Sequence, residues 1–341
     1  MLDACTEEYA DMSQVLAERN EWKAAGPIEY PPVVVWPPQP KAFLRWLPTY
    51  FVPFNVLYVA LSFLVWQFAT PSVTTMSTWG IGWVGFILLR NAVILVTWYG
   101  LFHGWLYVRK AQGARTKYNS RWPGKADRFT FGSQTRENIF YTLASGLPLL
   151  TAWEVVTLWL YSSGKIPWIY FRDHPVWFVA LMVLIPIYTE IHFYAIHRLI
   201  HFAPFYKTVH SLHHRNTNPS PWSGLSMHPL EHLIYFSSAA LFWVVPSNPV
   251  HALFCSFHRM MAPVPGHAGF DELEVGDSSV SLGGHAHYLH HKYFEVNYAD
   301  GILPLDRWFG SFHDGTAEAD AAMKRRRLAA RTAIDDSVGG H

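Results

Sequence analysis

Histidine is concentrated in one stretch of this 341-residue chain, and its spacing constrains the fold more than any other feature. Fifteen of the nineteen histidines lie between His192 and His291. Most of them fall into short motifs with spacings of three and four residues: H-R-L-I-H, H-S-L-H-H, H-P-L-E-H and H-Y-L-H-H. On a helix, such spacings place the imidazoles on one face. Because neutral imidazole is the commonest protein metal ligand, these faces predict that distant segments converge on a site for two metal ions.

The two H-x-x-H-H motifs and the H-R-L-I-H motif supply the strongest ligand candidates. Adjacent histidines repel one another when protonated, so they are costly unless a metal or deep solvation holds them neutral. Apolar neighbours such as Leu212 and Leu289 disfavour a solvated surface. We therefore predict eight metal ligands: His197, His201, His210, His213, His214, His287, His290 and His291.

The remaining histidines have different expected roles. His228 precedes Pro229, which favours a helix start, and we predict that His228 faces the site as a further ligand. Glu231 is either a partner of a ligand or a helix N-terminal carboxylate, and the role of His232 stays open. His192 faces away from His197 on a helix and is expected to be structural. Structural or interfacial roles are expected for His103, His174, His251, His258 and His285.

Composition places this chain in a membrane. Half of its residues are hydrophobic and 15% are charged, against about 25% in a typical soluble domain. The mean hydropathy of only +0.07 indicates that a sizeable polar part lies outside the bilayer. A net charge of +1 gives no reason to expect nucleic acid as a partner, and two cysteines without a C-x-x-C spacing exclude a thiolate metal site. The acidic, polar N-terminus is not a signal peptide.

Four apolar segments approach the roughly 20 residues that a bilayer requires, and they cover 49–69, 80–108, 138–161 and 175–196. A further apolar stretch, 233–262, is broken by Pro246 and Pro249 and predicts a re-entrant or interfacial helical hairpin. Arg90 and His103 interrupt the second segment, which is therefore expected to be tilted or partly buried in a bundle. Strand patterns are weak throughout. We expect an all-α membrane protein with about four spanning helices and a histidine-rich helical cap.

A basic loop between the second and third apolar segments, 109–137, predicts the orientation. By the positive-inside rule this loop is cytoplasmic, and four crossings return the chain to the same side. The histidine-rich face of this multi-pass protein is therefore expected to be cytoplasmic. The chain divides into a polar and Pro-rich N-terminal region (1–48), a transmembrane hairpin with the basic loop (49–134), a catalytic region (135–313) and a polar tail (314–341).

The kinds of side chain in the motifs narrow the choice of metal ion. Carboxylates are sparse among the motifs, which argues against Ca²⁺ and Mg²⁺, whereas imidazole suits Fe, Zn, Cu and Ni. Two ions at a membrane surface, beside aromatic walls, fit O₂ activation on an insoluble lipid in a site that excludes water. Four apolar residues near the motifs either line a substrate pocket or take part in ordinary packing: Trp222, Met227, Phe236 and Trp243. Two alternatives remain, a zinc-dependent membrane hydrolase or isomerase and a non-catalytic metal transporter or store.

The ordered motifs resemble a known family. H-R-L-I-H, H-S-L-H-H-R, M-H-P-L-E, H-A-G-F, H-Y-L-H-H-K-Y-F-E-V-N-Y and D-R-W-F-G-S-F together are similar to the fatty acid hydroxylase superfamily. That family includes sterol C5-desaturases, C4-methylsterol oxidases and fatty acid and carotenoid hydroxylases. The resemblance covers about 135–313, and the stretch from His285 to Phe312 looks most like the sterol desaturase branch.

The resemblance implies a di-iron centre that activates O₂ for hydroxylation or desaturation of a sterol, fatty acyl or isoprenoid lipid. It implies that the eight motif histidines are iron ligands, with His228 and His267 added, and that zinc can replace iron in a purified sample. Glu190 and Asn297 are implied as residues that support ligands. Ala299 stands where the family has glycine after Asn297-Tyr298. Because no cytochrome b5-like segment is present, electrons are expected from a separate donor of the cytochrome b5 or ferredoxin/reductase type.

Overall fold

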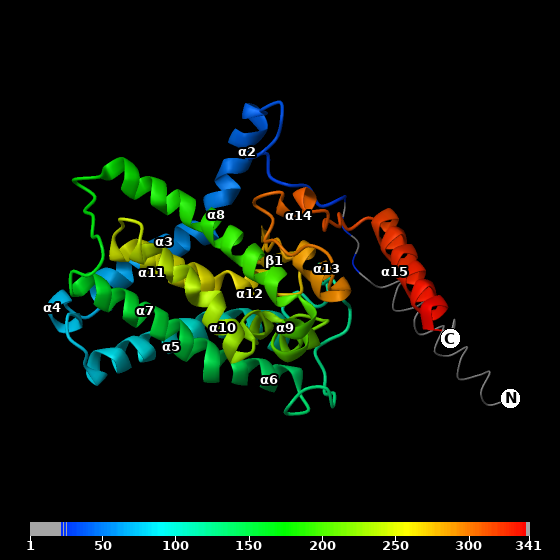
Figure 1. Cartoon of the computed structure of the whole chain (residues 1–341), viewed down its shortest axis with the longest axis horizontal. Coiled ribbons are helices and arrows are strands. Elements are labelled where there is room, and N and C mark those ends of the chain that lie inside the picture. The colour runs from blue at the N-terminus through cyan, green and yellow to red at the C-terminus, as the bar shows by residue number, and fades with distance from the viewer. Residues whose placement is uncertain (1–21, 23, 25, 339–341) are drawn as a thin grey trace.

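The structure, a computed structural model, describes residues 22, 24 and 26–338, and these are mostly helical (Figure 1). Of the N-terminal region predicted for 1–48, residues 1–21, 23 and 25 lie outside the described residues. Long helices form an elongated bundle: α3 (Phe54–Phe68), α5 (Ile81–His103), α7 (Leu147–Ser162), α8 (Pro175–Ile200) and α11 (Pro249–Met261). Twelve of the thirteen residues of α11 are buried, and this helix packs against α3, α7 and α8. The core of the bundle therefore surrounds α11.

Three helical segments are long and apolar enough to cross a membrane. They are Ile81–Val108, where α5 continues into the π-helix η1 (Gly104–Val108); Gln134–Ser162, where α6 (Gln134–Tyr141) and the π-helix η2 (Thr142–Gly146) lead into α7; and Pro175–Ile200, which is α8. These match the predictions for 80–108, 138–161 and 175–196.

The first predicted span, 49–69, is not one straight helix. The chain forms α2 (Pro40–Phe51) and α3, which are bent by 44° and together make a fourth candidate span. The break falls at Pro53, which lacks a backbone N–H and disfavours helical geometry in the preceding residue. Val52 is accordingly extended, with φ −106° and ψ 133°.

Arg90 is buried inside the bundle, as its place in an apolar segment predicts. Its guanidinium forms an ion pair with Glu154 of α7 and also donates to the Ala69 carbonyl. Asn91 donates to the same carboxylate at 2.9 Å. A charge in an apolar segment is tolerated when it pairs within the protein, and this cluster ties α5 to α7.

The predicted helical hairpin over 233–262 is present. It consists of α10 (Pro229–Tyr235), the 3-10 helix η5 (Phe236–Trp243) and α11, with Pro246 and Pro249 in or beside the turn. Asn248 caps α11 by accepting from Val250 N, and its amide donates to the Ile169 carbonyl at 2.9 Å. The polar turn is therefore satisfied by protein rather than by lipid or water.

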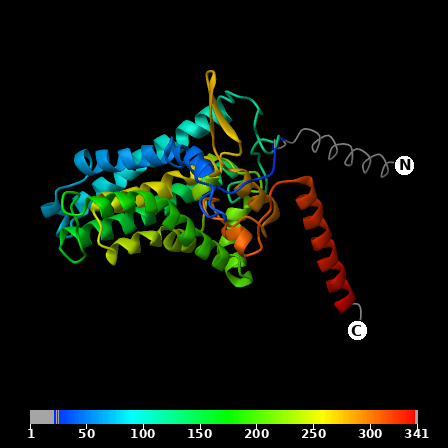
Figure 2. The same cartoon turned by 90° about the horizontal axis from the view of Figure 1, so that it is seen from above.

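One two-stranded sheet departs from the all-helical prediction. Strands β1 (Glu272–Val275) and β2 (Ser278–Ser281) pair antiparallel, with Val275 opposite Ser278. Gly276 in the two-residue turn has a φ of +60°, which glycine adopts without steric cost. The strands are too short for an alternating pattern to stand out in the sequence. The hairpin projects from the body of the protein (Figure 2).

Short elements gather at one end of the bundle and carry most of the histidine motifs (Figure 1). These elements are α9 (Ala203–Thr208), the 3-10 helices η3 (His210–Arg215) and η4 (Pro221–Leu225), α12 (Pro263–Gly266), α13 (His285–Tyr293) and α14 (Leu305–Trp308). The remaining described helices are α4 (Val73–Met76), at the opposite end, and α15 (Ala317–Val338), which extends away from the body in both views (Figures 1 and 2).

The basic loop 109–137 packs against this same histidine-bearing end. Tyr118 N donates to the Gly269 carbonyl at 3.0 Å, and Gln134 Nε2 donates to Asn216 Oδ1 at 3.0 Å. Arg215 pairs with Glu137 at 3.1 Å. The loop and the histidine motifs therefore lie on one side of the spanning segments.

Candidate metal centre

Nine histidines come together at this end in two groups whose ring nitrogens lie within 4.8 Å of one another inside each group. The five-histidine group contains His197, His201, His210, His214 and His290. The four-histidine group contains His213, His267, His287 and His291. All eight histidines of the repeated motifs belong to one group or the other, together with His267.

Each H-x-x-H-H motif divides its histidines between the two groups. On η3, His210 and His214 join the five-histidine group, whereas His213 joins the other. On α13 the division is reversed, because His287 and His291 join the four-histidine group and His290 joins the first. On the α-helix α13, His287 and His291 are four residues apart and share a face. The two motifs thus face one another across the pair of groups and connect them.

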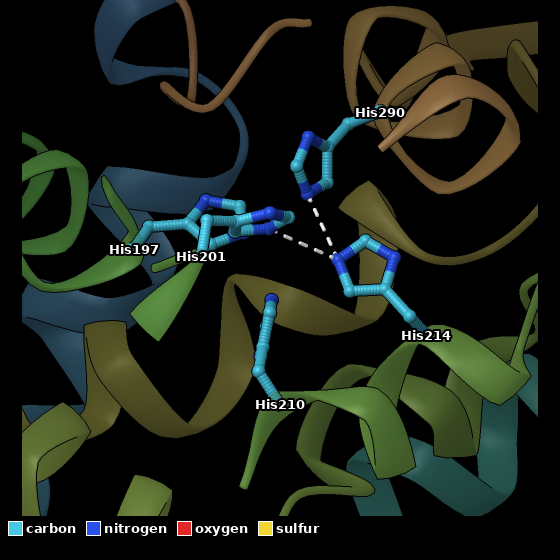
Figure 3. Close-up of side chains that lie close together, drawn as sticks. All are labelled: His197, His201, His210, His214 and His290. Carbon is cyan, nitrogen blue, oxygen red and sulfur yellow. Dashed lines mark hydrogen bonds between the residues drawn. The ribbon is translucent and has the colours of Figure 1, made fainter. Parts of the chain in front are cut away.

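In the five-histidine group, imidazoles from α8, η3 and α13 turn toward a common centre (Figure 3). His214 Nε2 lies 3.2 Å from His201 Nε2 and 3.1 Å from His290 Nε2. All members except His201 are buried. The H-R-L-I-H motif contributes from the end of α8, since His197 lies in its last turn and His201 follows it.

Oxygen acceptors fix the orientation of several rings. Five Nδ1 atoms lie within hydrogen-bonding distance of an oxygen: His197 with the Tyr298 carbonyl (2.8 Å), His210 with Glu231 Oε1 (2.8 Å), His213 with the Ser226 carbonyl (3.2 Å), His267 with the Pro263 carbonyl (2.9 Å) and His290 with the Val296 carbonyl (2.7 Å). A carbonyl can only accept, so the proton of those neutral rings is on Nδ1 and their Nε2 carries a lone pair. Metal-binding histidines are commonly oriented in this way.

These tautomers test whether a cation fits the site. His213 Nε2 and His267 Nε2 are 3.3 Å apart, yet both rings donate from Nδ1 to backbone carbonyls. Two lone pairs then face each other, which is unfavourable unless a cation lies beside them. In addition, the buried His210 Nε2 has no hydrogen-bond partner within the described part of the chain. The donor set therefore fits metal ions, which would remove both of these conflicts.

Burial keeps these rings neutral. Burial lowers the pKa of His213 to about 4 and that of His201 to about 3. For His201, repulsion from a protonated His213 ring lowers the pKa further. The pKa values of His210, His214 and His290 are lowered well below the ordinary histidine value by the same cause. Only the neutral imidazole binds a metal, so the rings are ready to bind at neutral pH.

The structure separates His228 and His232 from both groups. His228 caps α10, where its Nδ1 accepts from Leu230 N at 3.2 Å, and this local bond directs the ring toward its own backbone. His232 lies between Ser145 Oγ (2.7 Å) and the Leu225 carbonyl (3.1 Å). We therefore leave His228 out of the proposed ligand set. His192, expected to be structural, contacts Ser237 Oγ at 3.0 Å.

Neither Glu190 nor Asn297 contacts a ring of the two groups, but both hold the loop that does. Glu190 accepts from the backbone N–H groups of Gly301, Ile302 and Leu303 at 2.7, 2.8 and 3.0 Å. Asn297 has a φ of +52°. Its side-chain oxygen accepts a hydrogen bond from His313 N, and its side-chain nitrogen donates to the His313 carbonyl. Its two neighbours, Val296 and Tyr298, provide the carbonyls that orient His290 and His197. Backbone acceptors of this kind carry no side-chain signal in a sequence.

A cavity of about 250 Å³ opens onto both groups. Ligand candidates on its wall are His197, His210, His213, His267 and His287. Apolar side chains on its wall include Pro186, Phe193, Met227, Leu282 and Ile302. The cavity is thus lined by both imidazoles and apolar groups.

Of the four predicted pocket residues, Met227 lines this cavity and the other three do not. Trp222 packs against Tyr99, Phe236 stacks on His232, and Trp243 donates to Thr157 Oγ1 at 3.0 Å. These aromatic rings face packing partners in the bundle instead. The cavity also exposes Arg259 and Asp300, which we did not single out in the sequence. A lone arginine inside the apolar stretch 233–262 was the available signal.

Comparison with known proteins agrees with this arrangement. Residues 181–311, which hold all nine histidines of the two groups, match the sequence model of the fatty acid hydroxylase family. The matched region, which is less than half of the chain, is similar in sequence to the fatty acid hydroxylase family. The resemblance of its motifs to that superfamily is thereby confirmed.

The curated relatives are sterol-modifying proteins. A Delta(7)-sterol 5(6)-desaturase of Aspergillus fumigatus is 31% identical over 160 residues, which cover 40% of this chain and 49% of the relative. Methylsterol monooxygenase 1 of Gallus gallus is 30% identical over 148 residues, covering 41% and 49%. A putative Delta(7)-sterol-C5(6)-desaturase of Arabidopsis thaliana is 25% identical over 194 residues, covering 55% and 68%.

The chain thus spans about half the length of the first of these relatives. No solved structure matches it.

Proposed function

We propose that this protein is a membrane-bound di-iron oxidoreductase that hydroxylates or desaturates a sterol-type lipid with O₂. The observation that carries the proposal is the pair of buried histidine groups that share two motifs and open onto one largely apolar cavity. The sterol desaturase and methylsterol monooxygenase relatives support both the reaction class and the substrate class.

The nine histidines of the two groups would hold the two ions. An all-imidazole donor set without thiolates or Ca²⁺-type oxygen cages suits iron, and iron supplies the redox chemistry that O₂ activation requires. The balance of the reaction is simple. Hydroxylation converts one C–H bond, O₂, two electrons and two protons into an alcohol and one water. Desaturation consumes two C–H bonds on adjacent carbons with the same O₂, electrons and protons, and it yields a double bond and two waters.

The residues of the chain would orient the imidazole rings, keep them neutral and exclude water from the cavity. Carbonyls of Tyr298, Val296, Ser226 and Pro263 hold the rings in one tautomer, so that Nε2 faces inward. The apolar wall formed by Phe193, Met227 and Leu282 would hold a hydrocarbon surface beside them and exclude water. Electrons would come from a separate cytochrome b5 or ferredoxin/reductase type of donor.

We also propose that the histidine groups lie on the cytoplasmic side. The basic loop 109–137 contacts the histidine-bearing end, and short basic loops are retained in the cytoplasm. A donor protein in the cytoplasm could then reach the site without crossing the bilayer.

The test is a turnover assay on iron-loaded protein. Protein in lipid nanodiscs would receive a chemical or enzymatic reductant, O₂ and a panel of Δ7-sterols and methylsterols, with products analysed by mass spectrometry. We expect a product 16 mass units heavier for hydroxylation or 2 lighter for desaturation. Failure of fully iron-loaded protein to consume O₂ with the whole panel and both reductants would contradict the proposal.

A further inference from the structure

The cavity wall also carries two opposite charges. Arg259 at the end of α11 and Asp300 in the loop before α14 both line it. Arg259 is only 3% exposed, and its guanidinium carbon lies 3.6 Å from the centroid of the Tyr235 ring and 5.4 Å from that of Phe193. Its Nη atoms make long bonds to the Thr189 and Tyr235 carbonyls, at 3.5 and 3.3 Å. Its Nε has no hydrogen-bond partner in the described part of the chain.

A buried guanidinium with an unused donor is energetically unfavourable unless something else completes its hydrogen bonds. Packing alone explains the stem and the cation–π contact but leaves Nε without an acceptor. Since Arg259 lines a cavity that reaches the histidine groups, an oxygen atom of a bound molecule is the missing partner that best fits its position.

Asp300 supplies an acceptor on the same wall. Asp300 is exposed and also lines the cavity. Burial raises the pKa of Asp300 to about 6, and the positive charge of Arg259 opposes this rise. Within the described residues its carboxylate accepts no hydrogen bond. Glu190 and Glu231 also line the cavity. Backbone N–H groups donate to both oxygens of Glu190, and Glu231 Oε1 contacts His210 Nδ1, whereas Glu231 Oε2 has no hydrogen-bond partner in the described part of the chain.

The pair selects the chemistry of its ligand. A hydroxyl group both donates and accepts, so it can receive a hydrogen bond from Arg259 and give one to Asp300. A carboxylate would be attracted by Arg259 but repelled by Asp300, and a purely apolar end would leave the buried Arg259 Nε without an acceptor. We propose that Arg259 and Asp300 bind the hydroxyl group of the lipid substrate, an inference that rests on the proposed function.

This anchor would set the position of oxidation. Arg259 and Asp300 line the same cavity as the ligand candidates His197, His213 and His287. A substrate hydroxyl group held by the two charged residues would therefore determine which carbon of the substrate reaches the histidine groups. For a rigid molecule such as a sterol, fixing one end fixes the remainder. Arg259 and Asp300 would then be specificity-determining residues rather than metal ligands.

Binding without turnover tests this inference. Iron-loaded, oxidised protein without reductant would be titrated with a tritiated Δ7-sterol that carries a free 3-hydroxyl, with its 3-O-methyl ether and with a long-chain fatty acid. Variants would be Arg259→Met and Asp300→Leu, and Arg115→Met would be the control because Arg115 pairs with Glu274 at the surface. Iron content would be measured for every sample.

We expect wild type and Arg115→Met to bind the free hydroxyl about tenfold more tightly than the ether, the size of a hydrogen bond to a charged group. Arg259→Met and Asp300→Leu should abolish this preference while keeping their iron. Either variant retaining both iron and the full preference would overturn the inference, as would a wild type that prefers the ether or the fatty acid. If Arg259→Met does not retain iron, Asp300→Leu decides. Loss of turnover in the assay above with the preference intact would instead count against the proposed function.

Discussion

His210 and Glu231 are 2.8 Å apart, from Nδ1 to Oε1, and both side chains are buried. Burial raises the pKa of the Glu231 carboxyl well above its ordinary value, so its ionised form needs nearby positive charge. Metal ions held by the histidine groups would provide that charge, and the carboxylate would in turn orient His210. The acid in H-P-L-E-H therefore contributes to the site although its neighbour His228 does not belong to either group.

Replacing Glu231 tests this relationship. Glu231→Gln keeps an acceptor for His210 but removes the charge, whereas Glu231→Leu removes both. We expect iron affinity to fall about 10–100-fold in Glu231→Leu, and less in Glu231→Gln. Competition with a chelator of known affinity gives the measurement. Unchanged affinity in both variants would show that this contact does not support the metal site.

Asn297 is expected to act on the five-histidine group alone. Its neighbours Val296 and Tyr298 accept the Nδ1 protons of His290 and His197, and both rings belong to that group. Asn297→Ala removes the side-chain bonds that hold the loop and places alanine at a φ of +52°, so one of two bound irons should be lost first.

Asn297→Gly separates the two effects, because glycine tolerates that φ but lacks the amide. We expect Asn297→Gly to retain more iron than Asn297→Ala and less than wild type, as counted by metal analysis during chelator titration. Equal and full retention in both variants would contradict a positioning role for this loop.

The Arg90–Glu154 pair should be required for a stable bundle. Arg90→Met leaves a buried carboxylate without its counter-charge, which costs about 3–5 kcal/mol, whereas the double variant Arg90→Met/Glu154→Leu should recover most of that loss. Thermal unfolding in detergent reads out both. The exposed pair Arg172–Asp173 provides a control, since Arg172→Met should change stability by less than about 1 kcal/mol. A double variant no more stable than the single variant would refute this role.

Lys117 predicts a pH dependence of stability. Burial lowers the pKa of its ammonium from 10.5 to about 7. Above pH 10.5 the group is neutral in both states, and below pH 7 it is charged in both. Between these values only the unfolded chain holds the proton, so this residue makes stability fall as pH decreases from 10.5 to 7.

Lys117→Met should therefore raise the free energy of unfolding at pH 7 more than at pH 9.5, with a difference on the order of a few kcal/mol, which thermal unfolding at the two pH values would measure. Lys165→Met, at an exposed site, should shift both values equally. A Lys117→Met variant with the same pH dependence as wild type would show that the ammonium is not buried.

Sequence reasoning reached the spanning segments and the motif histidines because both follow from local periodicity. It could not rank His267 above His228 from local pattern alone, because only tertiary contacts decide which loop histidine reaches the site. For the same reason, the sequence could not predict that the carbonyls of Val296 and Tyr298 orient His290 and His197. The break at Pro53 and the lone Arg259 in an apolar stretch did leave signals, and the two-stranded sheet is too short to leave a clear one.

Counting iron tests the central claim most directly. Purified wild type and His174→Gln, a control at an exposed histidine outside both groups, should each bind two irons per folded chain, measured by plasma mass spectrometry against amino-acid analysis. His267→Ala, which removes one member of the four-histidine group, should bind fewer than two. One iron or none in folded wild type, or two irons retained tightly in His267→Ala, would contradict a two-metal centre built from these histidines.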